Sequence, residues 1–164
     1  MIQILEGSIY IEDNETFIKK IKRISEEKKS VIQALDADKL AGYQHLRFAV
    51  EKAMGSFENG RNIANDLAKE ILLYAAGTRQ INRALKMGTH KGRNNIVLVV
   101  VGEPFDILSE FNEISPGSVL QYNESKNMAL KEIFNITEDE IEAAGTDKIP
   151  ELVLERVALV DVMK

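Results

Sequence analysis

The run NNIVLVVVG, residues 94–102, constrains the fold more than any other stretch of this chain. Its β-branched residues favour a strand, and its unbroken apolar character predicts a strand that is buried on both faces. Two further stretches, residues 2–11 and 30–37, also predict strands. We interpret residues 70–77 (EILLYAAG) as a fourth strand, because Gly77 ends the apolar run.

Helical patterns separate these strands. Residues 38–60 carry apolar side chains at the three- and four-residue spacing of one buried helix face. Thr137 and Glu140 form the pattern of a capping box, and Pro150 suits the first turn of a last helix. Strands that alternate with helices predict an α/β (α+β) fold, with a mixed sheet of at least four strands covered by helices. The chain length predicts a single domain over residues 1–164.

Several classes of protein are excluded or disfavoured by composition. The chain has no cysteine, which excludes disulfide and thiol chemistry and fits a reducing cytoplasm. Its two histidines, His45 and His90, stand far apart, so we expect no metal site, and no cofactor motif is present. No pattern pairs a nucleophile with a base, so we expect no catalytic residues. The apolar runs fall far short of the roughly 20 residues of a membrane span, and the first residues lack a secretory pattern. We therefore expect a cytoplasmic protein without membrane contact.

A basic island interrupts this acidic chain. Residues 61–93 hold seven Lys or Arg against two acids, while the whole chain has a net charge of -5. Helical geometry after Thr78, a good N-cap, places three cations on one stripe, opposite Ile81 and Leu85, which we expect to be buried. The cations of this stripe are Arg79, Arg83 and Lys86. One interpretation is a solvated helix face, and the other is a binding site for phosphate at a helix N-terminus.

Three blocks in this order carry a family resemblance. They are QALDADKLAGYQHLRFAVEKA (33–53), GRNIA (60–64) and EILLYAAGTRQINRAL (70–85), and the valine-rich strand follows them. The chain resembles the small regulatory subunit of the KEOPS complex, the family that binds the complex's atypical small kinase. The resemblance implies an α/β fold and a non-catalytic role in making threonylcarbamoyladenosine in transfer RNA. It also implies binding to the kinase/ATPase subunit and, in archaeal-type members, to the single-stranded 3′ CCA end of transfer RNA, in the cytoplasm.

The resemblance implies a nucleic-acid site at the positions that match the family pattern. These positions are Arg61, Asn62, Thr78, Arg79 and Gln80. We add Lys69 and Arg83 from the charge argument, because a single-stranded end is held by a positive groove and by faces on which bases stack. Tyr43, His45 or Phe57 could supply such a face.

The last helix, residues 150–164, is apolar almost all round. Such a helix is either enclosed in its own core or packed between the core and a partner. The family resemblance favours the partner. The stripe that we predict to bind the kinase consists of Val153, Val157 and Val160. The side that we predict to face the core consists of Leu152, Leu159 and Met163.

Two alternative functions remain open. The chain could be a protein-interaction module that regulates the kinase without contacting RNA. It could also be an enzyme that acts on a phosphorylated small molecule at the N-terminus of the helix over residues 78–88. Binding to intact and 3′-truncated transfer RNA separates the RNA-binding hypothesis from the first alternative, and turnover would support the second.

Overall fold

The computed structural model describes residues 1–162, and the chain forms two compact units. The first unit comprises Met1–Ala37 and Gly88–Val119. The second unit comprises Asp38–Met87 and Leu120–Lys164. The chain therefore crosses between the units three times, and neither unit is a continuous segment of sequence. The expectation of a single domain stays a prediction, and the expectation that Met163 faces the core lies outside the described residues.

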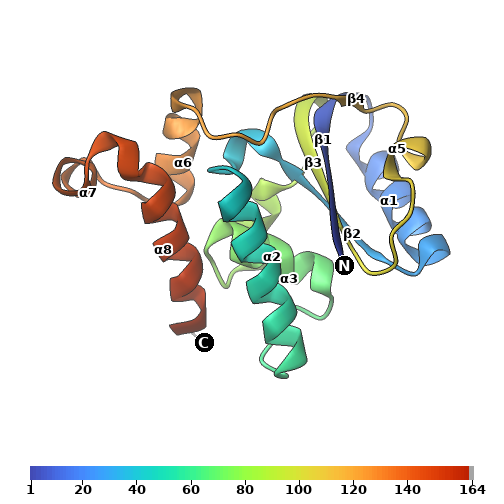
Figure 1. The fold of residues 1–164 in the computed structure, drawn as a ribbon, viewed down its shortest axis with the longest axis horizontal. Coiled ribbons are helices and arrows are strands. Elements are labelled where there is room, and N and C mark those ends of the chain that lie inside the picture. The colour runs from blue at the N-terminus through green and yellow to red at the C-terminus, as the bar shows by residue number, and fades with distance from the viewer. Residues whose placement is uncertain (163–164) are drawn as a thin grey trace. The chain divides into compact units, whose positions relative to one another are not determined.

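A four-stranded sheet lies in the first unit, in the order β2-β3-β1-β4 (Figure 1). Its strands are β1 (Ile2–Ile11), β2 (Val31–Asp36), β3 (Gly92–Val101) and β4 (Ser115–Pro116). β3 pairs with β1 over ten residues, from Ile2 opposite Val101 to Ile11 opposite Gly92. The α/β prediction, with a sheet of four strands and covering helices, is confirmed. All the pairings are antiparallel, where we expected a mixed sheet.

The core of the first unit lies between the sheet and two helices. These are α1 (Asn14–Lys28) and α5 (Ile107–Glu110), which cover one face of the sheet (Figure 1). Phe17 and Ile24 of α1 pack in one cluster with Leu98 and Val100 of β3. Because Ile96 to Val100 are all 0% exposed, β3 is buried on both faces, as its sequence predicted.

Helices build the second unit. They are α2 (Tyr43–Glu58), α3 (Leu67–Ala76), α4 (Ile81–Ala84), α6 (Asn127–Ile133), α7 (Glu138–Ala144) and α8 (Ile149–Val162). Short 3-10 turns are η1 (Ala37–Lys39), η2 (Leu85–Met87), η3 (Glu124–Lys126) and η4 (Thr146–Lys148). α2 packs on α3, and α8 packs on α2, α3 and α6. The capping box of Thr137 and Glu140 is present at the start of α7.

The interpretation of residues 70–77 as a strand is wrong, because they belong to α3 and its C-terminal cap. Asp66 caps the helix by accepting a hydrogen bond from a backbone N–H of the first turn. Gly77 ends it in the left-handed conformation (φ 63°) that favours glycine. Every residue from Glu70 to Ala76 is buried, so this part of the helix has no polar face that would reveal a 3.6-residue period.

A buried histidine connects three segments of the second unit. Nδ1 of His45 on α2 accepts a hydrogen bond from the Ala41 N–H at 2.9 Å. Nε2 therefore carries the proton of the neutral ring. The Nε2–H group donates a hydrogen bond to the Ala75 carbonyl on α3, also at 2.9 Å. The ring also meets the edge of Phe134. Burial lowers the pKa of His45 to about 4, so the ring is neutral in the folded protein at neutral pH.

Candidate nucleic-acid interface

The loop between α2 and α3 is shaped by one buried carboxylate. Glu70 of α3 is 0% exposed. Both of its carboxylate oxygens accept from the Ile63 N–H, at 3.0 and 3.1 Å, and one also accepts from the Ala64 N–H at 2.8 Å. A buried carboxylate needs such donors, and here the backbone of the loop supplies them. The N–H groups of the loop consequently turn inward, toward α3.

This loop forms one wall of a surface hollow of about 320 Å³, which we call the loop hollow. Its lining consists of Ile63, Ala64, Asn65, Lys69, Leu73, Arg79 and Ile81. Ile63 and Ile81 provide an apolar surface over the buried Leu73, and the side chains of Lys69 and Arg79 bring positive charge to it. Lys69 keeps half of its side chain exposed, and its Nζ lies 3.9 Å from the carboxylate of Asp66. A cationic rim with an apolar surface suits a phosphorylated group that carries a flat ring.

The segment after α3 is less helical than the sequence predicted. Thr78, expected to cap a helix, is buried, and its Oγ1 accepts from the Gln80 N–H at 3.1 Å. Gln80 itself occupies the N-cap position of α4 and makes no side-chain capping bond there. Because the hydroxyl of Thr78 serves the turn, Thr78 shapes the backbone that presents Arg79, while Gln80 is exposed.

The predicted buried side of this segment is also wrong. Ile81 and Leu85 are 38% and 55% exposed, whereas Ala84 and Met87 are 0% exposed. The reason is that α4 is one turn long and passes into the 3-10 turn η2, which changes the angle between successive side chains. The exposed Ile81 thereby becomes part of the loop hollow.

The predicted cations do not all meet in one place. Lys69 and Arg79 share the loop hollow, whereas Arg83 lines two other hollows. Arg61 borders a further hollow with Asn59 and residues of α2 and α8. The Asn62 side chain donates to the Ala64 carbonyl at 2.9 Å and helps to close the loop. The structure therefore places all of these cations in the second unit but distributes them over neighbouring hollows.

None of the three rings proposed for base stacking lines the loop hollow. His45 is 1% exposed, so its ring faces the interior. Tyr43 is 53% exposed, and its hydroxyl accepts from Arg47 one turn later. The side chains that do line the hollow, Ile63 and Ile81, look like ordinary core residues in the sequence. Only the fold shows that they reach the surface.

The predicted orientation of α8 is wrong. Val153, Val157 and Val160 are each 0% exposed, whereas Leu159, expected in the core, is 47% exposed. Leu152 is buried, as predicted. The helix turns its valines toward α2, α3 and α6, and its exposed residues recur at three- and four-residue spacing along the opposite side. These exposed residues are Glu151, Glu155, Leu159 and Val162.

A buried polar group fixes this orientation near the end of α8. The Tyr74 hydroxyl donates to one carboxylate oxygen of Asp161 at 2.5 Å. Lys52 of α2 donates to the other oxygen at 2.8 Å. Burial and the neighbouring carboxylate raise the pKa of Tyr74, which keeps the hydroxyl protonated as a donor. Asp161 therefore attaches α8 to two other helices at the same point.

Comparison with known proteins identifies the family. The family model described as Kinase binding protein CGI-121 matches residues 11–161, a stretch that runs through both units. The chain belongs to this family. It is 34% identical over 134 residues to a protein named Regulatory protein Cgi121 from Methanocaldococcus jannaschii, which covers 80% of this chain and 84% of that protein. It is 39% identical over 70 residues to a protein named KEOPS complex subunit Cgi121 from Pyrococcus abyssi, which covers 42% of this chain and 41% of that protein.

The family match confirms the resemblance that the sequence blocks carry. The three blocks supply most of α2, the loop braced by Glu70, and the segment through α4. In this member of the CGI-121 family, the described residues contain no group of three or more His, Asp or Glu side chains placed to hold a metal ion. Within residues 1–162, each helix is also too short or too polar to span a lipid bilayer.

Proposed function

We propose that the chain is a non-catalytic subunit of a KEOPS-type complex, which makes threonylcarbamoyladenosine in transfer RNA. In this role it binds the small kinase/ATPase subunit and recruits transfer RNA through the 3′ CCA end, in the cytoplasm. The description of the family, "kinase binding protein", and the names of its relatives, "regulatory protein" and "KEOPS complex subunit", support the regulatory role and the kinase partner. The transfer RNA partner depends on the site in the second unit.

The observation that carries the RNA proposal is the loop hollow. A single-stranded end offers phosphates and unstacked bases, and proteins hold such ends with cations beside surfaces that accept a base. Lys69 and Arg79 provide the cations, and Ile63 and Ile81 provide the surface. In this proposal Asn62 and Thr78 shape the backbone around the hollow, while Arg61, Gln80 and Arg83 extend the contact on either side.

The test compares intact transfer RNA with the same RNA lacking its terminal CCA, by fluorescence anisotropy. Removal of the three nucleotides should weaken binding roughly tenfold or more, because it removes the phosphates that face the cations and the bases that lie on the apolar side chains. Arg79→Glu should weaken binding to intact RNA and remove most of the difference between the two RNAs. Arg23→Glu, on the exposed surface of α1, is the matched control and should bind both RNAs as the wild type does. Equal affinity of the wild type for both RNAs would refute the proposal.

The second candidate function is a module that regulates the kinase without contacting RNA. The observation in its favour is that the family and the longer-matching relative are described only by kinase binding and regulation. Under this alternative the wild type would bind the small kinase subunit while showing no preference for the CCA end. The same anisotropy measurement, repeated with the kinase subunit present, therefore decides between the two functions.

A further inference from the structure

A second hollow, of about 270 Å³, opens beside α4 and α6, and we call it the α6 hollow. Three cations line it: Lys39, Arg83 and Lys86. Its apolar lining comes from Ala76, Ala129 and Ile133. Helical geometry predicted Arg83 and Lys86 on a common stripe with Arg79, but Arg79 lines the loop hollow instead. The α6 hollow is therefore a separate place at which positive charge gathers.

Two of these cations are available for a ligand. Within the described part of the chain, the side chains of Arg83 and Lys86 form no hydrogen bond or ion pair, in contrast to Arg47 and Arg156, which pair with carboxylates. Lys39 is held in place, because its Nζ donates to the Lys86 carbonyl at 2.6 Å. This bond ties η1 to η2 and keeps a third positive charge at the edge of the hollow.

A carboxylate in the same hollow selects the kind of ligand. Glu132 of α6 belongs to the lining, and its side chain likewise has no partner among residues 1–162. A bare phosphate would be attracted by Arg83 and Lys86 but repelled by Glu132. A nucleotide fits all of these groups: its phosphate can meet the cations, an amino group or ribose hydroxyl can donate to the carboxylate, and its base can lie on the apolar lining.

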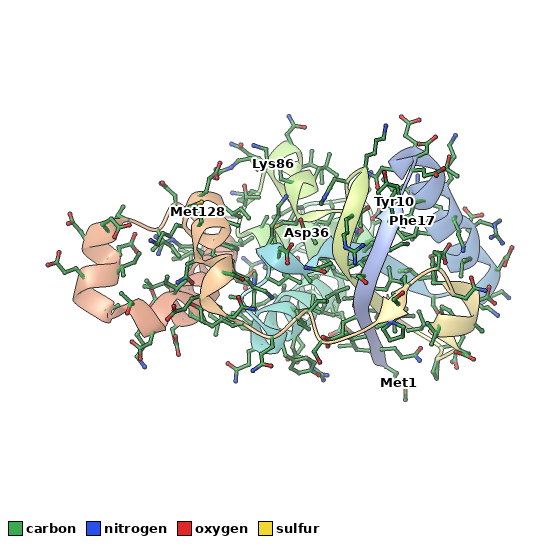
Figure 2. All side chains as sticks on the ribbon, turned by 90° about the horizontal axis from the view of Figure 1, so that it is seen from above. Met1, Tyr10, Phe17, Asp36, Lys86 and Met128 are labelled. Atoms are coloured by element: carbon green, nitrogen blue, oxygen red, sulfur yellow. The ribbon has the colours of Figure 1, made fainter. Side chains whose placement is uncertain are left out.

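The two hollows lie along the same segments of the second unit. α3 contributes Leu73 to the loop hollow and Ala76, about one turn later, to the α6 hollow. α4 contributes Ile81 to the first and Arg83 to the second. Figure 2 shows Lys86 on the segment after α4, and Met128 at the start of α6. Met128 is 82% exposed. A single strand that ends in the loop hollow can thus continue across α4.

We propose that the α6 hollow binds a further nucleotide of the same RNA strand, beyond the last four nucleotides that carry the CCA end held by the loop hollow. This inference rests on the proposed function, since it requires that the loop hollow holds the CCA end. Arg83 and Lys86 bind the phosphate of this nucleotide. Glu132 accepts from its base or ribose, and Lys39 positions the turn that carries Lys86. The site makes affinity depend on the length of the single strand.

The experiment measures anisotropy with two fluorescently labelled RNAs, of four and ten nucleotides, that both end in CCA. Lys86→Glu should weaken binding of the ten-nucleotide RNA about fivefold or more and reduce its log–log salt slope by roughly 0.7. It should leave binding of the four-nucleotide RNA unchanged. The matched control is Lys19→Glu, an exposed lysine on α1 that changes the net charge equally and should affect neither RNA.

The outcomes separate the two proposals. If the wild type binds the four-nucleotide RNA no better than an RNA without CCA, the proposed function fails. If it binds that RNA well but Lys86→Glu and Lys19→Glu behave alike with the longer RNA, only the α6 hollow is refuted. Equal losses for both RNAs in Lys86→Glu would also refute it, because Lys86 would then act on the CCA end itself.

Discussion

Among single residues, His45 couples folding to pH. In the unfolded chain the pKa of His45 is near 6.5. In the folded protein burial lowers the pKa of this ring to about 4. The unfolded chain therefore binds more protons between these values, and the free energy of unfolding should fall as pH drops from about 6.5 to about 4. The loss should reach about 3 kcal/mol, since each pKa unit corresponds to about 1.4 kcal/mol. Urea unfolding at several pH values measures it.

Two variants isolate this effect. His45→Gln should be less stable than the wild type at pH 7 but should lose less stability on acidification, because the titrating group is gone. Gln44→Ala, at an exposed position on the same helix and without a titrating group, should keep the wild-type pH dependence. Glu140 does not interfere, because its hydrogen bond with Arg156 lowers its pKa to about 2, and its contribution is lost only below about pH 4.5. The same acid loss in His45→Gln and the wild type would contradict the assignment.

Glu70 is the second residue with a testable role. Glu70→Ala leaves the N–H groups of Ile63 and Ala64 without their acceptor, so we expect a loss of roughly 1–3 kcal/mol in the free energy of unfolding. The loop hollow should also lose its shape, and affinity for CCA-ending RNA should fall at least tenfold at a temperature where the variant is folded. Glu58→Ala, at an exposed position on α2, is the control. RNA affinity equal to that of the wild type in folded Glu70→Ala would show that the loop is not part of the site.

The cations of the site could be predicted from the sequence, but its apolar half could not. Lys69 and Arg79 could be predicted because lysine and arginine are nearly always exposed, so a local excess of them in the sequence indicates a positive surface. Ile63 and Ile81 carry no such signal, because an isoleucine is usually buried. Their place in the hollow depends on the loop that Glu70 holds, and that bond joins residues six or seven positions apart with no regular spacing.

Among the elements, the sequence predicted best those helices and strands in which apolar and polar residues alternate regularly or an apolar run is unbroken. The sequence identified β3 by its unbroken valine run and α2 by its amphipathic spacing. α3 was missed because its buried residues hide the helical period. α8 was recognised as a helix but assigned the wrong buried side, since apolar residues occur almost all round it. Its charged positions held the missing signal, because Glu151 and Glu155 lie on the same side as the exposed Leu159.

The corrected orientation of α8 changes which of its residues should contact the kinase. Leu159→Glu should leave the fold intact, because this side chain is about half exposed, and it should weaken binding of the small kinase subunit at least tenfold if α8 contacts that partner. Val157→Glu should instead destabilise the protein by several kcal/mol, because it buries an unpaired charge. Thermal melting measures the stability of both variants, and isothermal titration with the kinase subunit measures the kinase affinity of Leu159→Glu.

Leu108→Glu is the matched control for the exposed leucine, since Leu108 is 40% exposed on α5. It should melt and bind the kinase as the wild type does. Full kinase affinity in Leu159→Glu would place the kinase-binding surface on another element. A folded, stable Val157→Glu would contradict the packing of α8 itself.

The whole molecule combines a net negative charge with a local concentration of cations. A net charge of -5 opposes contact with RNA over most of the surface. The cations that line the hollows all belong to the second unit, which the chain visits twice. RNA is therefore expected to bind through few phosphate contacts at defined positions, and not through a general attraction to the protein.

The salt dependence of binding counts these contacts. Seven cations line the loop hollow, the α6 hollow and the hollow beside Asn59. Lys39 donates to the Lys86 carbonyl and Lys52 to Asp161, so we count only the other five as phosphate contacts: Arg61, Lys69, Arg79, Arg83 and Lys86. If each neutralises one phosphate of a single strand, the log–log slope of affinity against salt should be about -3.5, and affinity should fall about 100-fold between 50 and 200 mM salt. A slope near -2 would indicate three contacts and would agree with the loss of the α6 hollow from the site. A slope steeper than about -5 would require phosphate contacts outside these hollows, on a chain whose net charge disfavours them.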